Sequence, residues 1–169
     1  SERLAQMIDK LLALAAVDAP ADPEGFEVAV ETRLSDVTQL DVDDLAGATL
    51  VTASALLDLL TRGELMRVID TCVGAGCPVL FALSVSGRVQ LLPADPLDAR
   101  IGSAFDAHQR RGGRLGPDAV GAAVSELGGV VVWPSPWRLD AAHAELMADW
   151  LDGWVAAACE QDPALEAER

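Results

Sequence analysis

Hydrophobic residues recur along the chain with a period of two in some segments and of three to four in others. The period of two, or an unbroken apolar run, predicts strands at residues 26–32, 48–53, 79–85, 89–93 and 130–133. In the first, FEVAVET, apolar residues alternate with acidic or small ones, as in a half-buried strand. The second, ATLVTA, is apolar on both faces, which is typical of a central parallel strand covered by helices. The fourth, VQLLP, is expected at a sheet edge.

The period of three to four predicts helices between these strands. They cover residues 62–73, 96–111, 116–127 and a long terminal stretch that Asp140 caps. Thr61 and Glu64 have the spacing of a capping box, in which a hydroxyl and a carboxylate each bind a backbone N–H at the helix start. Gly74 and Gly76 are expected to end that helix. Residues 162–169 are predicted to be a frayed tail.

The alternation of strands and helices predicts an α/β fold with a mainly parallel sheet. The strand, helix and strand within residues 48–85 predict a right-handed crossover between parallel neighbours. With 169 residues and no linker that would divide the sequence, we expect a single domain over residues 1–169.

The chain carries a formal net charge of −15, from 27 acidic and 12 basic residues. Nucleic-acid phosphates and anionic membrane surfaces repel such a chain, and the sequence has no stripe of Lys or Arg to overrule the total. Lys10 is the only lysine, so the composition indicates the codon bias of a high-GC genome. We therefore expect neither nucleic acid nor a membrane as the partner.

The cysteines indicate a reduced compartment. Cys72, Cys77 and Cys159 make an odd count, and two of them fall where helix and strand interiors are predicted. The first two lack a second ligand pair, and both histidines are distant in the sequence, so we expect no metal site. The sequence shows no signal peptide and no apolar run of about 18 residues, so we expect a cytoplasmic protein.

Small and polar residues follow the first two predicted strands directly. The two loops hold Ser35, Asp36, Val37, Thr52, Ala53 and Ser54. Ligands of open α/β sheets bind in the crevice beyond the carboxyl ends of the strands, so both loops are candidate binding loops. Two other interpretations stay open, because an Asp after a strand is also a common turn or helix-capping residue. Small residues also allow a helix to pack closely on a sheet.

The order of these segments resembles the later part of class I S-adenosylmethionine-dependent methyltransferases, and most of all small-molecule methyltransferases of high-GC bacteria. The likeness lies in ETRLSDVTQL, LAGATLVTASALLDLL and CPVLFALSVSGRV, and it extends over about residues 9–161. The resemblance implies a Rossmann-like three-layer fold, S-adenosylmethionine as the cofactor and transfer of its methyl group to a small-molecule acceptor.

The resemblance also implies roles for the two loops. In this family an acidic residue after the first of these strands accepts a hydrogen bond from the adenine amino group, and Asp36 stands at that position. Ser35 and Val37 lie beside it. The loop Thr52–Ser54 occupies the position from which such enzymes line the methionine part of the cofactor.

The sequence departs from this family at the glycine-rich loop that follows the family's first strand, where glycines let the backbone approach the cofactor. The only Gly-x-Gly, Gly74–Gly76, precedes a strand instead of following one. Asp9 is a weak candidate for the ribose-binding acid, because its spacing to the next apolar run is shorter than in the family. We expect that the part of the family that carries the glycine-rich loop is not represented in this sequence. The final strand of the family is also not evident after Gln161, and 169 residues are short for a complete methyltransferase sheet, so we expect a three-layer sandwich that is incomplete at both ends.

Three residues are candidates for the acceptor side. His108 lies on the apolar face of its helix, and histidine is the side chain most often used to exchange a proton at physiological pH, so it is the candidate catalytic base and substrate contact. A structural histidine at the core boundary is the alternative. Trp133 and Trp137 flank a Pro-Ser-Pro turn and are candidates for the walls of a substrate pocket, or for packing of a loop. The pair Trp150 and Trp154 predicts a core contact or the interface of a homodimer.

The rival function is that of a non-catalytic α/β interaction module, a degenerate or truncated relative of these enzymes. The lack of a glycine-rich loop favours the module, whereas the two strand-end loops favour the enzyme. A receiver domain of the flavodoxin-like type is excluded, because it needs a lysine after a late strand and the only lysine is Lys10.

Overall fold

The computed structural model describes residues 33–82 and 85–168. Contacts between Cα atoms divide the chain into a first unit, Ser1–Ser35, and a second unit, Asp36–Arg169. All helices and strands given below belong to the second unit. The strand predicted at residues 26–32 and the candidate acid Asp9 lie outside the described residues.

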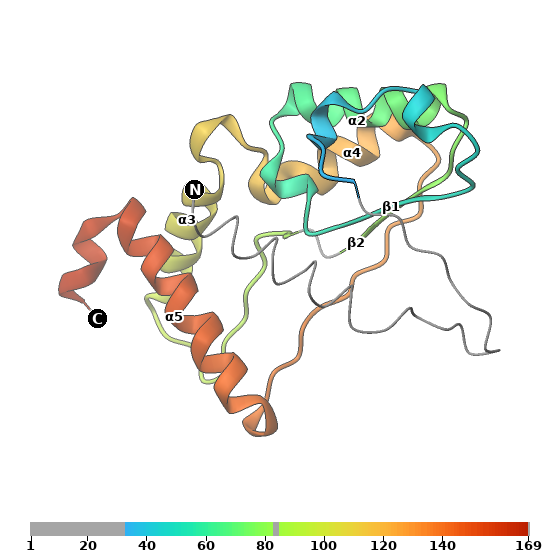
Figure 1. The fold of residues 1–169 in the computed structure, drawn as a ribbon. Coiled ribbons are helices and arrows are strands. Elements are labelled where there is room, and N and C mark those ends of the chain that lie inside the picture. The colour runs from blue at the N-terminus through green and yellow to red at the C-terminus, as the bar shows by residue number, and fades with distance from the viewer. Residues whose placement is uncertain (1–32, 83–84, 169) are drawn as a thin grey trace. The chain divides into compact units, whose positions relative to one another are not determined.

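Two parallel strands, β1 (Val51–Ser54) and β2 (Val79–Ala82), form a sheet in the second unit. They are in register, with Val51 opposite Val79. Helix α2 (Arg62–Gly74) connects them, so strand, helix and strand follow in the predicted order (Figure 1). The described part of the chain is thus a mixed α/β structure with a small parallel sheet, as the sequence predicts at this coarse level.

Strand β1 begins later than predicted, at Val51 instead of residue 48. A turn occupies the preceding residues, because Gly47 has a φ of 81° and the Ala48 N–H donates to the carbonyl of Leu45 at 3.0 Å. An apolar run alone does not show where this turn ends and the extended backbone starts.

Helix α2 begins with the capping box that the sequence predicts. The Glu64 N–H donates to the Thr61 hydroxyl at 3.3 Å, and the Thr61 N–H donates to Glu64 Oε2 at 2.8 Å. The bond from the Thr61 backbone, followed by one from its hydroxyl, lowers the pKa of Glu64 because both stabilise the charged carboxylate. The predicted start of the helix is therefore confirmed.

The main core lies where α2, α4 (Ala119–Leu127) and the sheet meet. Its buried residues are Leu57, Leu60, Leu65, Val68, Ile69, Cys72, Ala119, Ala122 and Ala123. Leu65 is wholly buried, and half-buried strand residues such as Val79 and Phe81 pack against this cluster. Burial of these side chains supplies the driving force that holds the helices on the sheet.

Only one face of the sheet is covered by the described residues. Burial alternates along both strands, so Val51 and Phe81 are half-buried whereas Ser54 and Leu80 are exposed. Leu80 is 57% exposed. The prediction that β1 is covered on both faces is wrong for this part of the chain, because the helices packed on the sheet contribute their apolar residues to one face only.

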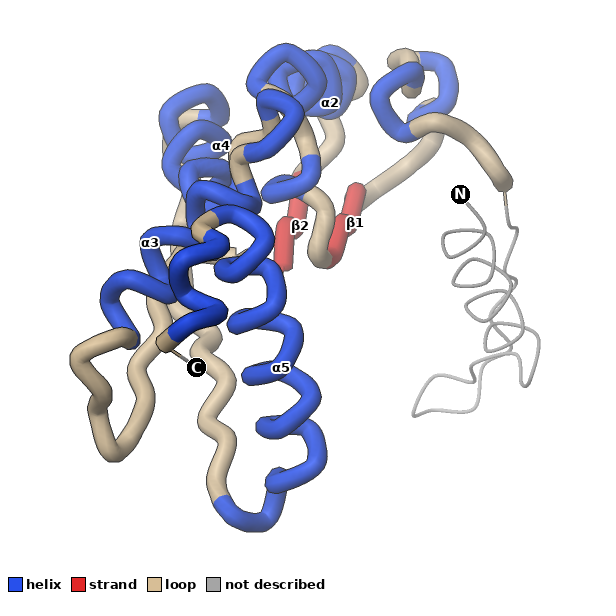
Figure 2. Tube along the Cα trace, turned by 90° about the vertical axis from the view of Figure 1, so that its left-hand side faces the viewer, coloured by secondary structure: helices blue, strands red, loops and turns tan. Residues whose placement is uncertain are grey.

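Helices α3 (Asp98–Gln109) and α5 (Ala144–Gln161) lie side by side and enclose a second apolar cluster (Figure 2). The buried residues of this cluster are Ala104, Ala158, Cys159 and Leu165. On the predicted inner face of α5, Trp154 is 3% exposed and stacks on Trp150 with 5.5 Å between ring centroids. This pair therefore makes a core contact within the chain.

The chain end differs from the frayed tail predicted for residues 162–169. Pro163–Ala167 form a short 3₁₀ helix, η7, whose Leu165 is 4% exposed. Arg100 of α3 binds Asp162 at 2.8 Å and also pairs with Glu168. Arg100 thus holds residues 162–168 in place from more than 60 positions away in the sequence. The local composition of this segment gives no sign of such a contact.

Two predicted strands are absent from the described residues. Residues 89–93 and 130–133 form neither strand nor helix. Val131 is 74% exposed and Trp133 is 83% exposed, so the prediction of a buried strand there is wrong. A run of β-branched residues forms a strand only when a neighbouring strand pairs with its backbone N–H and C=O groups. Among the described residues, no strand pairs with residues 130–133.

We predict that Thr61→Ala lowers the free energy of unfolding by about 1 kcal/mol, because it removes the acceptor for the Glu64 N–H. Urea titration monitored by circular dichroism measures this loss. The control Thr61→Ser keeps a hydroxyl and should lose much less. An equal loss in both variants would show that the methyl group of Thr61, and not the cap, stabilises the helix.

Candidate functional site

The carboxyl ends of β1 and β2 lie together, because the strands are parallel and in register. The Ala55 N–H donates to the carbonyl of Ala82 at 3.1 Å, directly after the last residue pair. Ala55 has a φ of 52°, the left-handed region that residues with a Cβ rarely adopt. Such strain clusters at binding and active sites, so this sheet edge is the candidate functional site.

Asp36 caps a short 3₁₀ helix, η1 (Val37–Gln39). Its Oδ1 accepts from the Thr38 N–H at 2.9 Å and from the Thr38 hydroxyl at 2.8 Å. The hydroxyl bond, followed by the backbone bond, lowers the pKa of Asp36 because both stabilise its charged form. The capping role that the sequence left open is therefore realised, and the carboxylate is exposed.

The loop predicted at Thr52–Ser54 is part of strand β1 in the structure, because these residues pair with β2. Three of the six predicted binding residues come together around a small cavity of about 110 Å³. Val37, Thr52 and Ala53 line it, together with apolar residues of α2 and β2. This volume is well below the roughly 300 Å³ at which ligand pockets begin. Ser54 is exposed outside it, and Ser35 is an exposed residue of the first unit. The cavity is a gap between helix and sheet, as the packing interpretation of the small residues expects.

His108 lies in the contact between α3 and α5. Its Nε2 is 3.1 Å from Glu160 Oε2, and its Nδ1 is buried with no hydrogen-bond partner in the described chain. Arg111 also binds the Glu160 side chain, at 3.4 Å. His108 lines neither of the two cavities described in this section. This geometry fits the structural histidine better than the catalytic base.

Trp133 and Trp137 do not wall a pocket within the described residues. They are 83% and 61% exposed and lie on residues 130–140, which form no helix or strand. Pro134 and Pro136 between them lack the N–H that a strand ladder needs. The structure leaves both rings open to solvent.

Asp58 is a site residue that the sequence analysis missed. It lies four positions after the end of β1, in the 3₁₀ helix η3 (Leu57–Leu59). The residue is 8% exposed, and within the described chain its Oδ1 has no hydrogen-bond partner. The signal in the sequence is an acidic residue inside the leucine run LLDLL, where a charge is costly to bury.

Asp106, on α3, is a second missed carboxylate, and it lies against the loop after β2. A Cβ on Gly87 would lie 2.7 Å from Asp106 Oδ2, and Gly87 has a φ of 68°, so only glycine fits there. Burial raises the pKa of Asp106, with Arg110 opposing the shift and Asp118 adding to it. Its Oδ1 is buried without a partner among residues 33–82 and 85–168.

The short 3₁₀ helix η5 (Gly116–Asp118) links the elements that hold these two carboxylates. It packs against η3, which holds Asp58, and against α3, which holds Asp106. The Leu115 N–H just before it donates to the carbonyl of Leu60 at 2.8 Å. Asp58 therefore stands four positions after the end of β1, whereas Asp106 lies within α3 and is related to β2 only through Gly87 in the loop that follows it.

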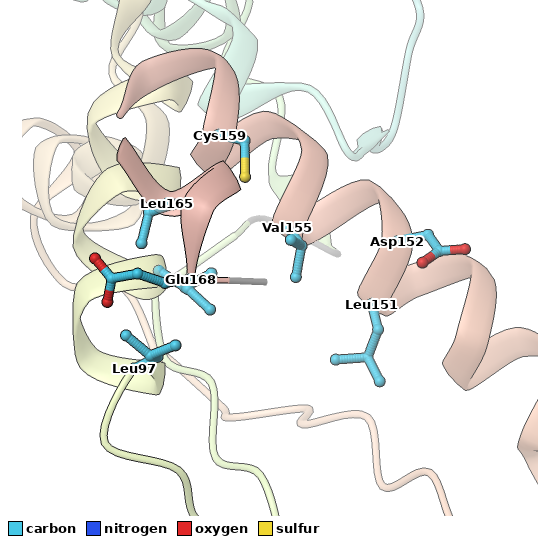
Figure 3. Close-up of a pocket in the computed structure, with 8 residues that line it drawn as sticks. Leu97, Leu151, Asp152, Val155, Cys159, Leu165 and Glu168 are labelled. Atoms are coloured by element: carbon cyan, nitrogen blue, oxygen red, sulfur yellow. The ribbon is translucent and has the colours of Figure 1, made fainter. Parts of the chain in front are cut away.

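A larger cavity of about 240 Å³ lies between α3, α5 and η7 (Figure 3). Its lining is mainly apolar and comprises Leu97, Ile101, Leu151, Asp152, Val155, Cys159, Leu165 and Glu168. In Figure 3 the carboxylate of Asp152 points away from Leu97 and Leu165. The cavity contains none of the predicted site residues and lies among helices, away from the strand ends.

The described residues contain no group of three or more His, Cys, Asp and Glu side chains that could hold a metal ion. No helix in that part of the chain is long and apolar enough to cross a membrane. Comparisons of the chain with protein-family models, with curated proteins and with solved structures find no match.

We predict that Asp106→Asn raises thermal stability at neutral pH. The folded-state pKa of Asp106 lies above its unfolded value of 3.8, so the charged carboxylate destabilises the fold at neutral pH. This cost disappears as the pH falls through the folded-state pKa towards the unfolded one. The difference in melting temperature between variant and wild type should therefore shrink between neutral pH and about pH 4.

Differential scanning calorimetry at several pH values measures this difference. The exposed Asp149 provides the matched control, since Asp149→Asn removes the same charge from the surface of α5. A gain for Asp106→Asn that does not depend on pH, or an equal gain for the control, would contradict the explanation by burial.

Proposed function

We propose that the protein is a cytoplasmic S-adenosylmethionine-dependent methyltransferase that acts on a small molecule, and that β1 and β2 belong to a Rossmann-like three-layer sheet. The observation that carries the proposal is the strained Ala55, with a φ of 52°, at the carboxyl end of parallel strands. This is the place where open α/β sheets bind their ligands. The resemblance of the surrounding segments to class I methyltransferases indicates that the ligand is S-adenosylmethionine.

The arrangement of the strand ends suits this chemistry. Methyl transfer from a sulfonium needs little covalent help, since the donor brings the reactive group and the protein must hold donor and acceptor aligned. Ala53, Ser54 and Ala55 are small, which allows the backbone to approach a ligand closely. In this proposal Thr52–Ser54 contact the methionine part of the cofactor.

Asp36 remains suited to the adenine amino group although it caps η1. A carboxylate has room for about four hydrogen bonds, and the Thr38 bonds occupy two of these. The lowered pKa keeps the group charged and able to accept at neutral pH. Ser35 and Val37, its neighbours in the sequence, complete the proposed adenine contacts.

The acceptor side is less well supported by the predicted residues. The contact between His108 and Glu160 would have to open before the His108 Nε2 could receive a substrate proton. Trp133 and Trp137 are exposed and are proposed as aromatic contacts for an acceptor. Two other carboxylates are nearer to the strand ends. Asp58 lies four positions after β1, and Asp106 lies against Gly87 in the loop after β2.

One observation favours the second candidate function, an α/β interaction module. Residues 130–137 expose four large apolar side chains, Val131, Val132, Trp133 and Trp137, each more than half exposed. Exposed apolar segments of this kind are typical of protein–protein contact sites. A module would use this segment and would have no need for the strain at Ala55.

We predict that the chain binds S-adenosylhomocysteine and that Asp36→Ala weakens the binding roughly tenfold or more, because a hydrogen bond to a charged group is lost. Isothermal titration calorimetry measures the affinity. Asp43→Ala is the matched control, since it removes an exposed carboxylate from the neighbouring 3₁₀ helix. Affinities lowered equally in both variants would indicate a general charge effect.

If the folded wild-type chain does not bind S-adenosylhomocysteine, the result contradicts the enzyme proposal and favours the interaction module. Binding that both variants leave unchanged would keep the enzyme but remove Asp36 from its cofactor site.

A further inference from the structure

The cavity between α3, α5 and η7 contains none of the residues that the proposed function uses. Its volume is about 240 Å³. Apolar side chains of three elements line it: Leu97 and Ile101 at the start of α3, Leu151, Val155 and Cys159 of α5, and Leu165 of η7. A water molecule takes only roughly 30 Å³ in the liquid, and protein interiors contain few voids larger than one water. This space is therefore large enough to hold a small molecule.

The charged groups at the cavity do not face its interior. In Figure 3 the carboxylate of Asp152 points away from Leu97 and Leu165, and the carboxylate of Glu168 points away from Val155. Glu168 pairs instead with Arg100 of α3. A water molecule in a protein cavity needs two to four polar partners, which an apolar lining does not supply. An apolar ligand, by contrast, would restore the dispersion contacts that the lining side chains lack on their open side.

The end of the chain forms one wall of the cavity and is held there by specific contacts. Leu165 is 4% exposed, so it is buried against the two helices. The Arg100 Nη2 donates to Asp162 Oδ2 at 2.8 Å, and Arg100 also pairs with Glu168. Arg100 is the direct neighbour of Ile101, which lines the cavity. The same turn of α3 therefore holds η7 in place and contributes to the lining.

We propose that this cavity binds an uncharged, mainly apolar small molecule, at a site separate from that of the proposed methyl donor. An apolar cavity of about 150 Å³ holds benzene, so in proportion this one takes a molecule of about ten non-hydrogen atoms. The net charge of −15 repels anions from the protein. A cation would lose its hydration inside an apolar lining without gaining a partner there. The ligand is therefore neutral.

Calorimetric titration of the full chain tests the chemical class of the ligand. The probes are indole, benzoate and 2-phenylethylammonium, which are similar in size and are neutral, negative and positive. We expect indole to bind with a Kd of about 1 mM or below, and each ion to bind about tenfold more weakly or less, because its charge must be desolvated. Lack of indole binding, or an ion that binds as tightly as indole, overturns the inference.

A variant that fills the cavity tests the location of the site. Val155→Phe places a ring in the space and should weaken indole binding about tenfold or more. Val73→Phe is the matched control, since it adds the same ring at a position of α2 that is 63% exposed, and it should bind indole as the wild type does. A Val155→Phe protein that is folded by circular dichroism and keeps the wild-type affinity overturns the inference.

An overpacked Val155→Phe could fail to fold, so two further measurements carry the same test. Leu151→Phe fills the cavity from a half-buried position and should also weaken indole binding about tenfold or more. In the ¹⁵N-labelled wild type, indole should shift the amide signals of residues 97–101 and 151–168. Shifts concentrated in residues 52–58 would place indole at the strand ends and contradict the proposed site.

Titration in the presence of S-adenosylhomocysteine separates this inference from the proposed function. We expect saturating S-adenosylhomocysteine to leave the indole affinity unchanged, because the cavity contains no strand-end residue. Competition between the two ligands overturns the separate site. Indole binding by a chain that does not bind S-adenosylhomocysteine contradicts the methyltransferase alone, and the converse result contradicts this inference alone.

Discussion

The packing of α2 on one face of β1 and β2 is the contact on which the second unit depends. Parallel strands cannot be joined by a tight turn, so the connecting helix must cross over the sheet and bury its apolar stripe there. Leu65 is wholly buried in this contact, and the Thr61 cap fixes where the helix starts. The same crossover brings the carboxyl ends of both strands to one edge, which is where a binding site can form.

Local patterns predicted the parts of the fold that depend on local interactions. The sequence predicted the capping box at Thr61 and the order of β1, α2 and β2 correctly. Both features depend on residues that are only a few positions apart in the sequence. The prediction of a strand at residues 130–133 was wrong, because a strand needs a neighbouring strand to pair with and local sequence does not show whether one is present. The ordered chain end was missed for the same reason, since it depends on Arg100 of a distant helix.

The candidate site shows the same division. The sequence named Asp36 and the small residues of Thr52–Ser54 from their position at strand ends, and two of these four, Thr52 and Ala53, line one small cavity between helix and sheet. It passed over Asp58 and Asp106, because burial without a partner is visible only once the chain is folded. An acidic residue within a leucine run is a cue that can be seen in the sequence, and here it marks a buried carboxylate with an unpartnered Oδ1 among the described residues.

We propose that ligands bind at the carboxyl ends of β1 and β2. Nuclear magnetic resonance with ¹⁵N-labelled protein tests it directly, by mapping which amide signals shift when S-adenosylhomocysteine is added. We predict shifts concentrated in residues 36–38 and 52–58, around Ala55. Shifts concentrated around the cavity between α3 and α5, near Val155 and Leu165, would contradict it, as would the absence of any shift.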